Sequence, residues 1–116
     1  MARTLRNRKL AGPTAGNTTA VTLYTVATNL RARINKLTVL NTNSTTARLL
    51  TVYLVPSGDS AADANALIKQ VGIGPYEAIT VAEAISHLLD EGDSVQFLQD
   101  TGTDLIAHLS GTEYLV

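Results

Sequence analysis

The stretch RARINKLTVLN, residues 31–41, alternates polar and apolar side chains and sets the expectation for the fold. Ala32 and Ile34 fall on one side of an extended chain, whereas Arg31 and Arg33 fall on the other. Successive side chains of a β-strand point to opposite faces, so this period of two predicts a strand with one apolar face and one basic face.

The apolar positions change parity in the middle of this stretch. Leu37 and Val39 are odd-numbered, whereas Ala32 and Ile34 are even-numbered. A shift of one residue would move every later side chain to the opposite face, unless an extra residue is inserted in the strand. We therefore expect a β-bulge near residues 35–36, which re-aims the side chains.

The neighbouring segments also predict strands. Residues 21–26 (VTLYTV) alternate, and residues 47–55 (ARLLTVYLV) are apolar on both faces. An apolar pattern on both faces is typical of a central strand, or of one that meets another subunit. Clusters of Asn, Ser, Thr, Pro and Gly at 41–46 and 56–59 predict the turns between the strands.

The second half of the chain is more mixed. Residues 60–70 are rich in alanine and predict a short helix or a turn-like crossover between sheets. Residues 78–81 predict a short strand, and residues 82–89 fit either a helical turn or irregular chain. Strands at 94–98 and 104–110, separated by a loop that contains glycine, predict an antiparallel hairpin.

Together these segments predict six to eight short strands with turn signals every 8–12 residues. That pattern is typical of an all-β fold, an antiparallel β-sandwich or jelly roll, here with one short helical crossover. We expect residues 18–116 to form this sandwich and residues 1–17 to form a flexible basic N-terminal arm. The arm could dock on a neighbouring subunit, be a plain mobile terminus, or bind nucleic acid weakly.

Composition narrows the class of protein. The 116-residue chain contains no cysteine, which excludes disulfides and thiolate metal sites. It has no apolar run long enough to cross a bilayer and no stretch typical of a secretory signal, so a soluble protein made in the cytosol is expected. Residues 1–48 hold eight basic and no acidic side chains, whereas residues 49–116 hold ten acidic side chains and one lysine. Such a division favours contacts between basic and acidic surfaces of partner subunits.

No stretch of the sequence carries a complete catalytic or metal-binding pattern. The acidic turn at 90–93 lacks the spacing of a twelve-residue calcium loop, and residues 72–75 lack the Lys-Ser/Thr of a phosphate-binding loop. Ser86 and His87 would point to opposite faces of a strand, and His108 and Ser110 would share a face without the third member of a triad. We therefore predict no catalytic, cofactor-binding or metal-binding residue, and we do not expect an enzyme.

Four stretches resemble the small β-sandwich virion proteins of tailed bacteriophages: LYTV at 23–26, RARINKLTVLN at 31–41, TVYLV at 51–55 and EGDSVQ at 91–96. The resemblance covers about residues 20–98 and consists of strand and turn patterns. Several proteins of this kind are cement (decoration) proteins that sit as trimers on the capsid, and others build necks, tail tubes, baseplates or fibre attachments. The resemblance therefore implies a component of the virion, assembled in the host cytoplasm.

On this basis we expect a capsid cement protein that binds the outside of the head and bridges neighbouring capsomers. The implied partners are the major capsid protein or another virion protein and further copies of the chain, with a trimer favoured, and neither a membrane nor a specific nucleic acid. The alternatives are a tail, neck or baseplate component and, from another class, a glycan- or receptor-binding β module. The residues expected to contact partners are Arg3, Arg6, Arg8, Lys9, Arg31, Arg33 and Tyr114.

Overall fold

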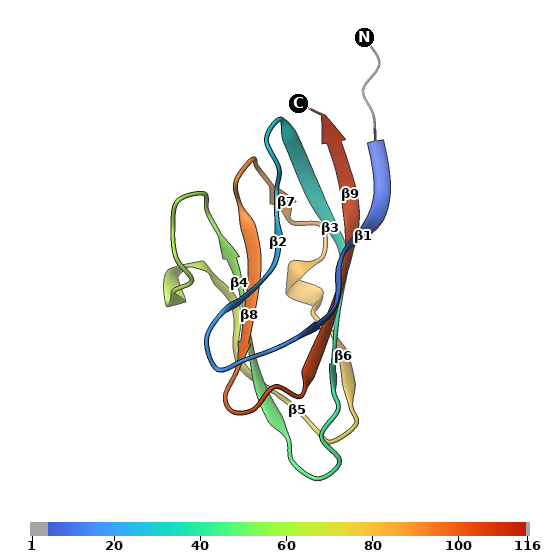
Figure 1. Cartoon of the computed structure of the whole chain (residues 1–116), viewed down its shortest axis with the longest axis vertical. Coiled ribbons are helices and arrows are strands. Elements are labelled where there is room, and N and C mark those ends of the chain that lie inside the picture. The colour runs from blue at the N-terminus through green and yellow to red at the C-terminus, as the bar shows by residue number, and fades with distance from the viewer. Residues whose placement is uncertain (1–4, 116) are drawn as a thin grey trace.

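Two antiparallel sheets pack face to face in the computed structural model, which describes residues 5–115 (Figure 1). The elements are β1 (Leu5–Ala15), β2 (Val21–Thr25), β3 (Leu30–Asn41), β4 (Arg48–Val55), η1 (Asp63–Asn65), β5 (Ala66–Ile73), β6 (Ala78–Thr80), η2 (Ala82–Ala84), β7 (Leu88–Leu89), β8 (Ser94–Gln99) and β9 (Leu105–Leu115). The expected all-β sandwich is confirmed. Across the described residues the helical elements are two short 3₁₀ turns, and neither is a helix that could cross a membrane.

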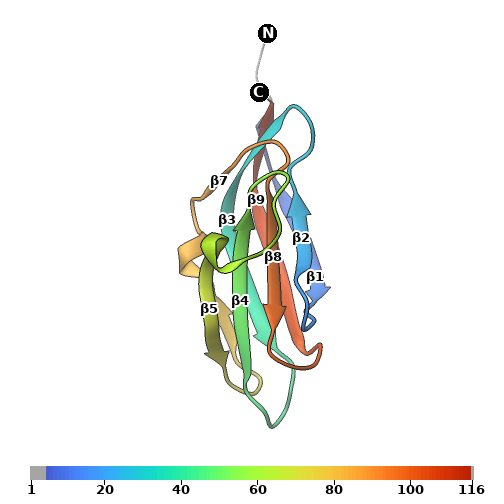
Figure 2. The same cartoon turned by 90° about the vertical axis from the view of Figure 1, so that its left-hand side faces the viewer.

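The strand order is that of a jelly roll. One sheet runs β1-β9-β3-β6, with β7 also paired to β3, and the other runs β2-β8-β4-β5. Figure 2 shows the second sheet in front of the first. Most connections in the described chain cross from one sheet to the other, which is how a jelly roll interleaves its strands.

The core lies between the sheets and is built by alternate residues of the long strands. Phe97 on β8 is its largest fully buried side chain. Ile34 and Leu37 are both fully buried, although they differ in parity. Ile34 pairs with Gly111 and Lys36 pairs with Ser110, so one extra residue interrupts the ladder between β3 and β9. The bulge expected at residues 35–36 is confirmed, and it keeps both halves of β3 on the core.

Strand β4 is an interior strand, as its two apolar faces predicted. It pairs with β8 on one side and β5 on the other. Leu50 and Val52 face the core, and the outward Thr51 and Tyr53 are also buried. Strand β5 helps to bury Thr51, because the Gln70 backbone N–H donates a hydrogen bond to the Thr51 hydroxyl at 3.1 Å.

The expected flexible arm is corrected by the structure. Residues 5–15 form strand β1, which pairs with β9 from Leu5 opposite Tyr114 to Ala15 opposite Ile106. The physical reason is that the segment alternates after all. Its inward arginines meet a carboxylate on β9, and Leu10 packs against the core. Residues 1–4, and with them the predicted partner-binding Arg3, lie outside the described residues.

One further expectation for local structure is confirmed in part, and another is wrong. Within the alanine-rich stretch 60–70 the expected short helix is the single 3₁₀ turn Asp63–Asn65, and the chain then enters β5 in the same sheet as β4 instead of crossing between sheets. Strands β8 and β9 do not form a hairpin but belong to different sheets. The buried Gln99 directs the crossing, since its side-chain oxygen accepts the Leu105 N–H at 3.0 Å.

The short elements between β5 and β8 cover the free side of β3. The predicted strand at 78–81 is confirmed as β6. The ambiguous segment 82–89 combines both alternatives, a 3₁₀ turn at Ala82–Ala84 and the two-residue strand β7. Backbone bonds join this segment to Ile34 and Leu37, so the edge of β3 is occupied between β6 and β7.

Candidate functional site

The sheet formed by β1, β9 and β3 has two faces of opposite character. The odd-numbered residues of β9 point inward and are buried, apart from the terminal Leu115, whereas the even-numbered residues point outward. Among the residues of these three strands, Glu113 is the only carboxylate, and it points inward. The outer face therefore carries positive charge without an acidic side chain of its own strands. Its basic members are Lys9, Arg31, Arg33, Lys36 and His108.

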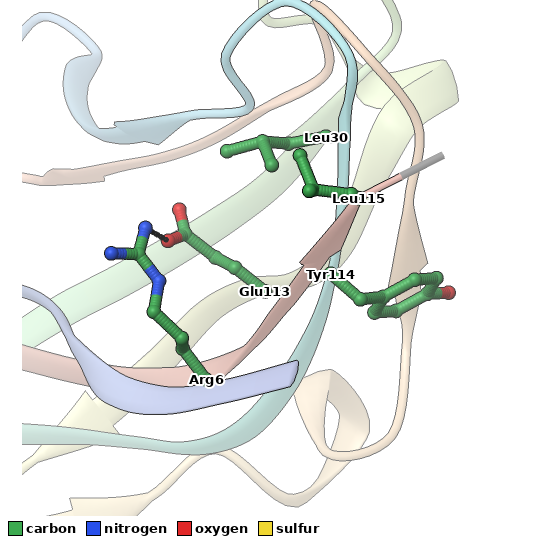
Figure 3. Close-up of a pocket in the computed structure, with 5 residues that line it drawn as sticks. All are labelled: Arg6, Leu30, Glu113, Tyr114 and Leu115. Carbon is green, nitrogen blue, oxygen red and sulfur yellow. Dashed lines mark hydrogen bonds and ion pairs between the residues drawn. The ribbon is translucent and has the colours of Figure 1, made fainter. Parts of the chain in front are cut away.

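The inner face holds an ion cluster around the buried Glu113, whose side chain is 4% exposed. Glu113 Oε1 accepts hydrogen bonds from Arg8 Nη1 at 3.0 Å and Arg6 Nη2 at 3.3 Å. Glu113 Oε2 accepts a short hydrogen bond from the Tyr24 hydroxyl, which reaches across from the other sheet. The cluster ties β1 and β2 to β9. Figure 3 shows Arg6 reaching the carboxylate while Tyr114 points away from it.

The protonation equilibria of this cluster follow from its contacts. Burial acts to raise the pKa of Glu113, but the Tyr24 hydrogen bond and the two arginines outweigh it, so the pKa lies below its usual value. Burial and the neighbouring Glu113 carboxylate raise the pKa of the Tyr24 hydroxyl well above its usual value. Glu113 is therefore held charged and Tyr24 neutral, which suits a permanent structural contact.

A shallow pocket of about 160 Å³ lies beside this cluster, at the end of the sandwich where β9 finishes. Its walls are Arg6, Leu30, Glu113, Tyr114 and Leu115 (Figure 3). Both carboxylate oxygens of Glu113 already accept hydrogen bonds from side chains of this chain. The polar part of the pocket therefore belongs to the ion cluster that holds the strands together.

The structure divides the predicted partner-binding residues between the two faces. Arg6 and Arg8 contact Glu113 on the inner side, although their side chains remain 57% and 48% exposed. Lys9, Arg31, Arg33 and Tyr114 lie on the outer face of the same sheet. Sequence reasoning treated Arg6, Arg8 and Lys9 as one basic group, because the alternation of β1 was not recognised.

The end of the outer face near the start of β1 combines arginines with apolar side chains. Leu5, Tyr114 and Arg31 lie side by side on β1, β9 and β3. Arg33 pairs in register with Leu88 on β7, and Leu5 and Leu88 are 68% and 66% exposed. We call these five residues the upper patch. Tyrosine and arginine beside apolar side chains are enriched at protein–protein contacts.

Hydrogen bonds and one ion pair fix this part of the face. Arg31 Nε lies 3.2 Å from Asp90 Oδ1, and Arg33 Nη2 donates to the Ser86 hydroxyl at 3.2 Å. Below them, Asn35 Nδ2 donates to the Thr112 hydroxyl at 3.1 Å, and that hydroxyl donates to Asn7 Oδ1 at 2.5 Å. The surface is thus partly ordered before any partner arrives, which lowers the entropy lost on binding.

The rest of the outer face holds residues that sequence reasoning did not select. Lys36 and His108 lie there beside Lys9, on β3 and β9. The sequence did contain evidence for Lys36. In residues 31–41 the apolar positions change from even to odd numbers, which predicts the bulge, and a bulge at residues 35–36 places Lys36 on the same face as Arg31 and Arg33. The position of His108 required the pairing of β9 with β3, which the sequence did not reveal.

Two acidic side chains in the loops, Asp93 and Asp104, have structural roles. Asp93 accepts the backbone N–H groups of Ser57 and Asp90, so it closes the loops at one end of the sandwich. At the other end Asp104 is bonded to Arg48 and Asn43, and these contacts hold the pKa of Asp104 well below its usual value. Within residues 5–115, no group of three or more His, Asp or Glu side chains has the arrangement of a metal site.

Comparisons with known proteins identify a fold. No protein-family model matches the chain, and no curated protein matches it in sequence. A solved structure of Bacillus endospore appendages, described as a novel family of disulfide-linked pili, superposes with a TM-score of 0.57 at 12% identity, over 100% of this chain and 92% of the other. The structure of infectious bursal disease virus, strain Gx, contains a chain that superposes with a TM-score of 0.51 at 12% identity, over 97% of this chain and 32% of the other. At such low identity, the chain is shown to be a β-sandwich similar in fold to subunits of a pilus and of a virus, with no family specific to phages among the matches.

Proposed function

We propose that this chain is a capsid cement protein of a tailed bacteriophage, which binds the outside of the head and bridges neighbouring capsomers. The observation that carries the proposal is the outer face of β1, β9 and β3. It has basic side chains, the exposed Leu5 and Leu88 beside the half-buried Tyr114, and no carboxylate on its own strands. A stable sandwich with such a face is suited to docking on a protein surface of opposite charge.

The fold supports this class of function by analogy. Jelly rolls recur in viral capsid proteins and lectins, and one of the similar chains comes from a virus. Fold alone does not determine function, so the surface must supply the argument. The upper patch offers apolar contact area through Leu5, Tyr114 and Leu88, and it offers charge through Arg31 and Arg33. The proposed partner is an acidic surface of the major capsid protein.

The charge distribution also suggests contacts between copies of the chain. The acidic side chains other than Glu113 lie outside the β-strands, in loops and turns, whereas the outer face is basic. Copies placed side by side on a shell could set acidic loops against basic strands, which favours a defined register. We propose a trimer as the bound form. Since the chain has no cysteine, its assembly rests on non-covalent contacts, unlike the disulfide-linked pili that it resembles in fold.

The mechanical role follows from many weak contacts acting together. Exposed ion pairs contribute only about 0–1 kcal/mol each, so a single docked copy would be held modestly. Linked copies on a shell bind at high effective concentration, and the combined attachment can exceed that of one copy by orders of magnitude. A bridge between two capsomers adds contacts that must break before the shell opens.

The test is to add the purified protein to expanded capsids that lack it. We expect saturable binding at hundreds of copies per particle and a rise in the temperature at which the capsids release their DNA. The double variant Arg31→Ala/Arg33→Ala should bind more weakly. Lys69→Ala, which removes an exposed cation that pairs with Asp63 away from this face, should bind normally.

The alternatives give different results in the same assay. A tail, neck or baseplate component would be present in a few copies at one vertex, and its addition would leave the release temperature unchanged. Saturated capsids with unchanged stability would disprove the cement role. Equal binding by the double variant and by Lys69→Ala would show that another surface makes the contact.

A further inference from the structure

A hollow interrupts the outer face of the β1-β9-β3 sheet beyond the upper patch. Its lining residues are Lys9, Lys36, Thr38, His108, Leu109 and Ser110, and its volume is about 290 Å³. A regular sheet has a nearly flat surface of side chains, so a hollow at this position needs a cause. We refer to it as the Ser110 hollow.

The cause is a pair of bulges that face each other across β9. The ladder between β1 and β9 shifts register between Lys9 and Ala11, next to Ser110. The ladder between β3 and β9 shifts between Ile34 and Lys36, also next to Ser110. Bulges increase the local twist and re-aim side chains, and they are over-represented beside functional sites. Here both of them act at the same level of one strand.

The two bulges leave Lys9 and Lys36 as the direct neighbours of Ser110 on either side. Adjacent strands lie about 4.8 Å apart, so the backbones of the two lysines are about 10 Å apart, within reach of one shared ligand. Two residues along β9, His108 pairs in register with Thr38. The hollow therefore gathers two ammonium groups, an imidazole and two hydroxyls, all of which can donate hydrogen bonds to an anion.

The two lysines differ from the arginines of the same sheet in their contacts. None of the ion pairs found among residues 5–115 involves Lys9 or Lys36. By contrast, the neighbouring Arg6 and Arg8 both contact Glu113. Like charges placed close together on a sheet are unfavourable, and a bound anion removes that repulsion. The imidazole lies against the Gly12 backbone, because a Cβ on Gly12 would lie 3.0 Å from His108 Nδ1.

We propose that the Ser110 hollow binds an oxyanion, namely the carboxylate of an acidic side chain on a protein partner. The choice of a protein partner rests on the proposed docking of this face, because the hollow is continuous with the upper patch of Tyr, Arg and Leu. Single-stranded nucleic acid would require aromatic platforms for its bases, and Tyr114 is the only aromatic side chain on the strands of this face that the structure describes.

The hollow can be tested on the isolated protein, without capsids. Inorganic phosphate serves as the simplest oxyanion probe, and backbone amide signals in NMR spectra report where it binds. We expect saturable shifts confined to Lys9, Lys36, His108 and Ser110. Lys36→Ala should weaken binding about fivefold, and Lys9→Ala/Lys36→Ala should abolish the localised shifts. Lys69→Ala, an exposed lysine away from the face, should change nothing.

A second arm identifies the source of the oxyanion. A capped peptide of four glutamates should shift the same amides more strongly than phosphate does, and the matching glutamine peptide should not. Shifts spread over all the basic residues, or unchanged in the double variant, would overturn the oxyanion site. A short DNA that binds more tightly than the peptide, through Arg31, Arg33 and Lys36 together, would overturn the protein partner. Normal phosphate binding with no capsid binding would refute the proposed function and leave the oxyanion site intact.

Discussion

The two faces of strand β1 use the same kind of side chain in different ways. Arg6 and Arg8 point toward the space between the sheets and contact the buried Glu113. Lys9 points outward, and the part of the chain that the structure describes holds no ion pair for it. Three cations within four residues are thus divided by the period of the strand. The inner pair stabilises the fold, and the outer one remains for a partner.

The same division continues across β9 and β3. Glu113 and Gly111 on the inner side serve packing and charge balance, whereas Ser110 and Thr112 on the outer side form a polar surface. If this division is real, substitutions on the inner face should destabilise the protein. Substitutions on the outer face should leave stability unchanged and affect binding alone.

The largest effect is expected at Gly111, where β9 passes between the two bulges. A Cβ at this position would lie 2.4 Å from the Arg33 backbone oxygen and 2.7 Å from Leu10 Cδ1. Since a backbone atom cannot move without disturbing β3, we expect Gly111→Ala to reduce the free energy of unfolding by about 3 kcal/mol. Urea denaturation followed by circular dichroism measures this difference.

Gly72 provides the matched control, because it is also a strand glycine. The nearest atom to a Cβ there is Leu49 Cδ2, at 3.9 Å. Gly72→Ala should be neutral or stabilise by about 0.5 kcal/mol, because alanine restricts the unfolded chain. A similar loss in both variants would mean that the glycine effect is unrelated to the approach of β3 to β9.

The next largest effect concerns Glu113. Replacing it with glutamine keeps the shape but removes the charge that holds Arg6, Arg8 and Tyr24. Because the arginines are half-exposed and can be hydrated, we expect Glu113→Gln to cost about 2 kcal/mol rather than the full cost of breaking a buried pair. Urea denaturation measures it, and Glu83→Gln at an exposed position should change stability by less than about 0.5 kcal/mol. Equal effects would show that the contacts of Glu113 with Arg6, Arg8 and Tyr24 do not stabilise the fold.

Glu113 should also make the stability of the protein depend on pH. The pKa values of Glu113 and Asp104 are lower in the folded protein than their usual values of about 4, so the unfolded state takes up protons first as the pH falls. Their contribution to stability is therefore fully present above about pH 5 and decreases as the pH falls through 4 and below. Urea midpoints measured between pH 7 and pH 3 should decline over that range.

The variant Glu113→Gln separates the two groups. It should have a shallower decline with acid than the unmodified protein, with the remaining slope due to Asp104 and its contacts with Arg48 and Asn43. An unchanged slope would indicate that Glu113 is not held charged in the folded state. Tyr24 acts in the opposite range: its raised pKa means that stability decreases above about pH 10, when the unfolded chain loses the phenol proton.

Strands with a clear local pattern of polar and apolar residues were predicted correctly from the sequence. The prediction failed for strands whose position depends on pairing with a distant segment of the chain. The period of RARINKLTVLN was enough for β3 and its bulge, and the two apolar faces of 47–55 were enough for the interior strand β4. The sheet to which β9 belongs could not be read, because a loop with Gly102 fits a hairpin and a crossing equally well. The strand character of residues 5–15 was missed because Glu113, the partner of their arginines, lies more than 100 residues away in the chain.

The candidate site was predicted in part for the same reason. Arg31, Arg33 and Tyr114 were selected as charged or aromatic residues on strands, and the structure places them on one outer face. Lys36 joins them because of the bulge in β3, which the parity of residues 31–41 indicated, whereas His108 joins them through the pairing of β9 with β3. That pairing joins segments far apart in the chain, and no short stretch of sequence contains it.

The smallest effect gives the sharpest comparison, because it concerns adjacent residues of one strand. Arg8 Nη1 lies 3.0 Å from Glu113 Oε1, whereas Lys9 points to the other side. Arg8→Ala should cost about 1 kcal/mol, and Lys9→Ala should change stability by less than about 0.5 kcal/mol while weakening phosphate binding. Both substitutions remove one positive charge from the same edge strand. A general effect of net charge would therefore change the free energy of unfolding of the two variants by the same amount. If instead the two side chains lie on opposite faces of β1, Arg8→Ala should lose stability and Lys9→Ala should lose phosphate binding. Urea denaturation and phosphate titration of the two proteins therefore decide whether the two faces of this sheet have separate roles.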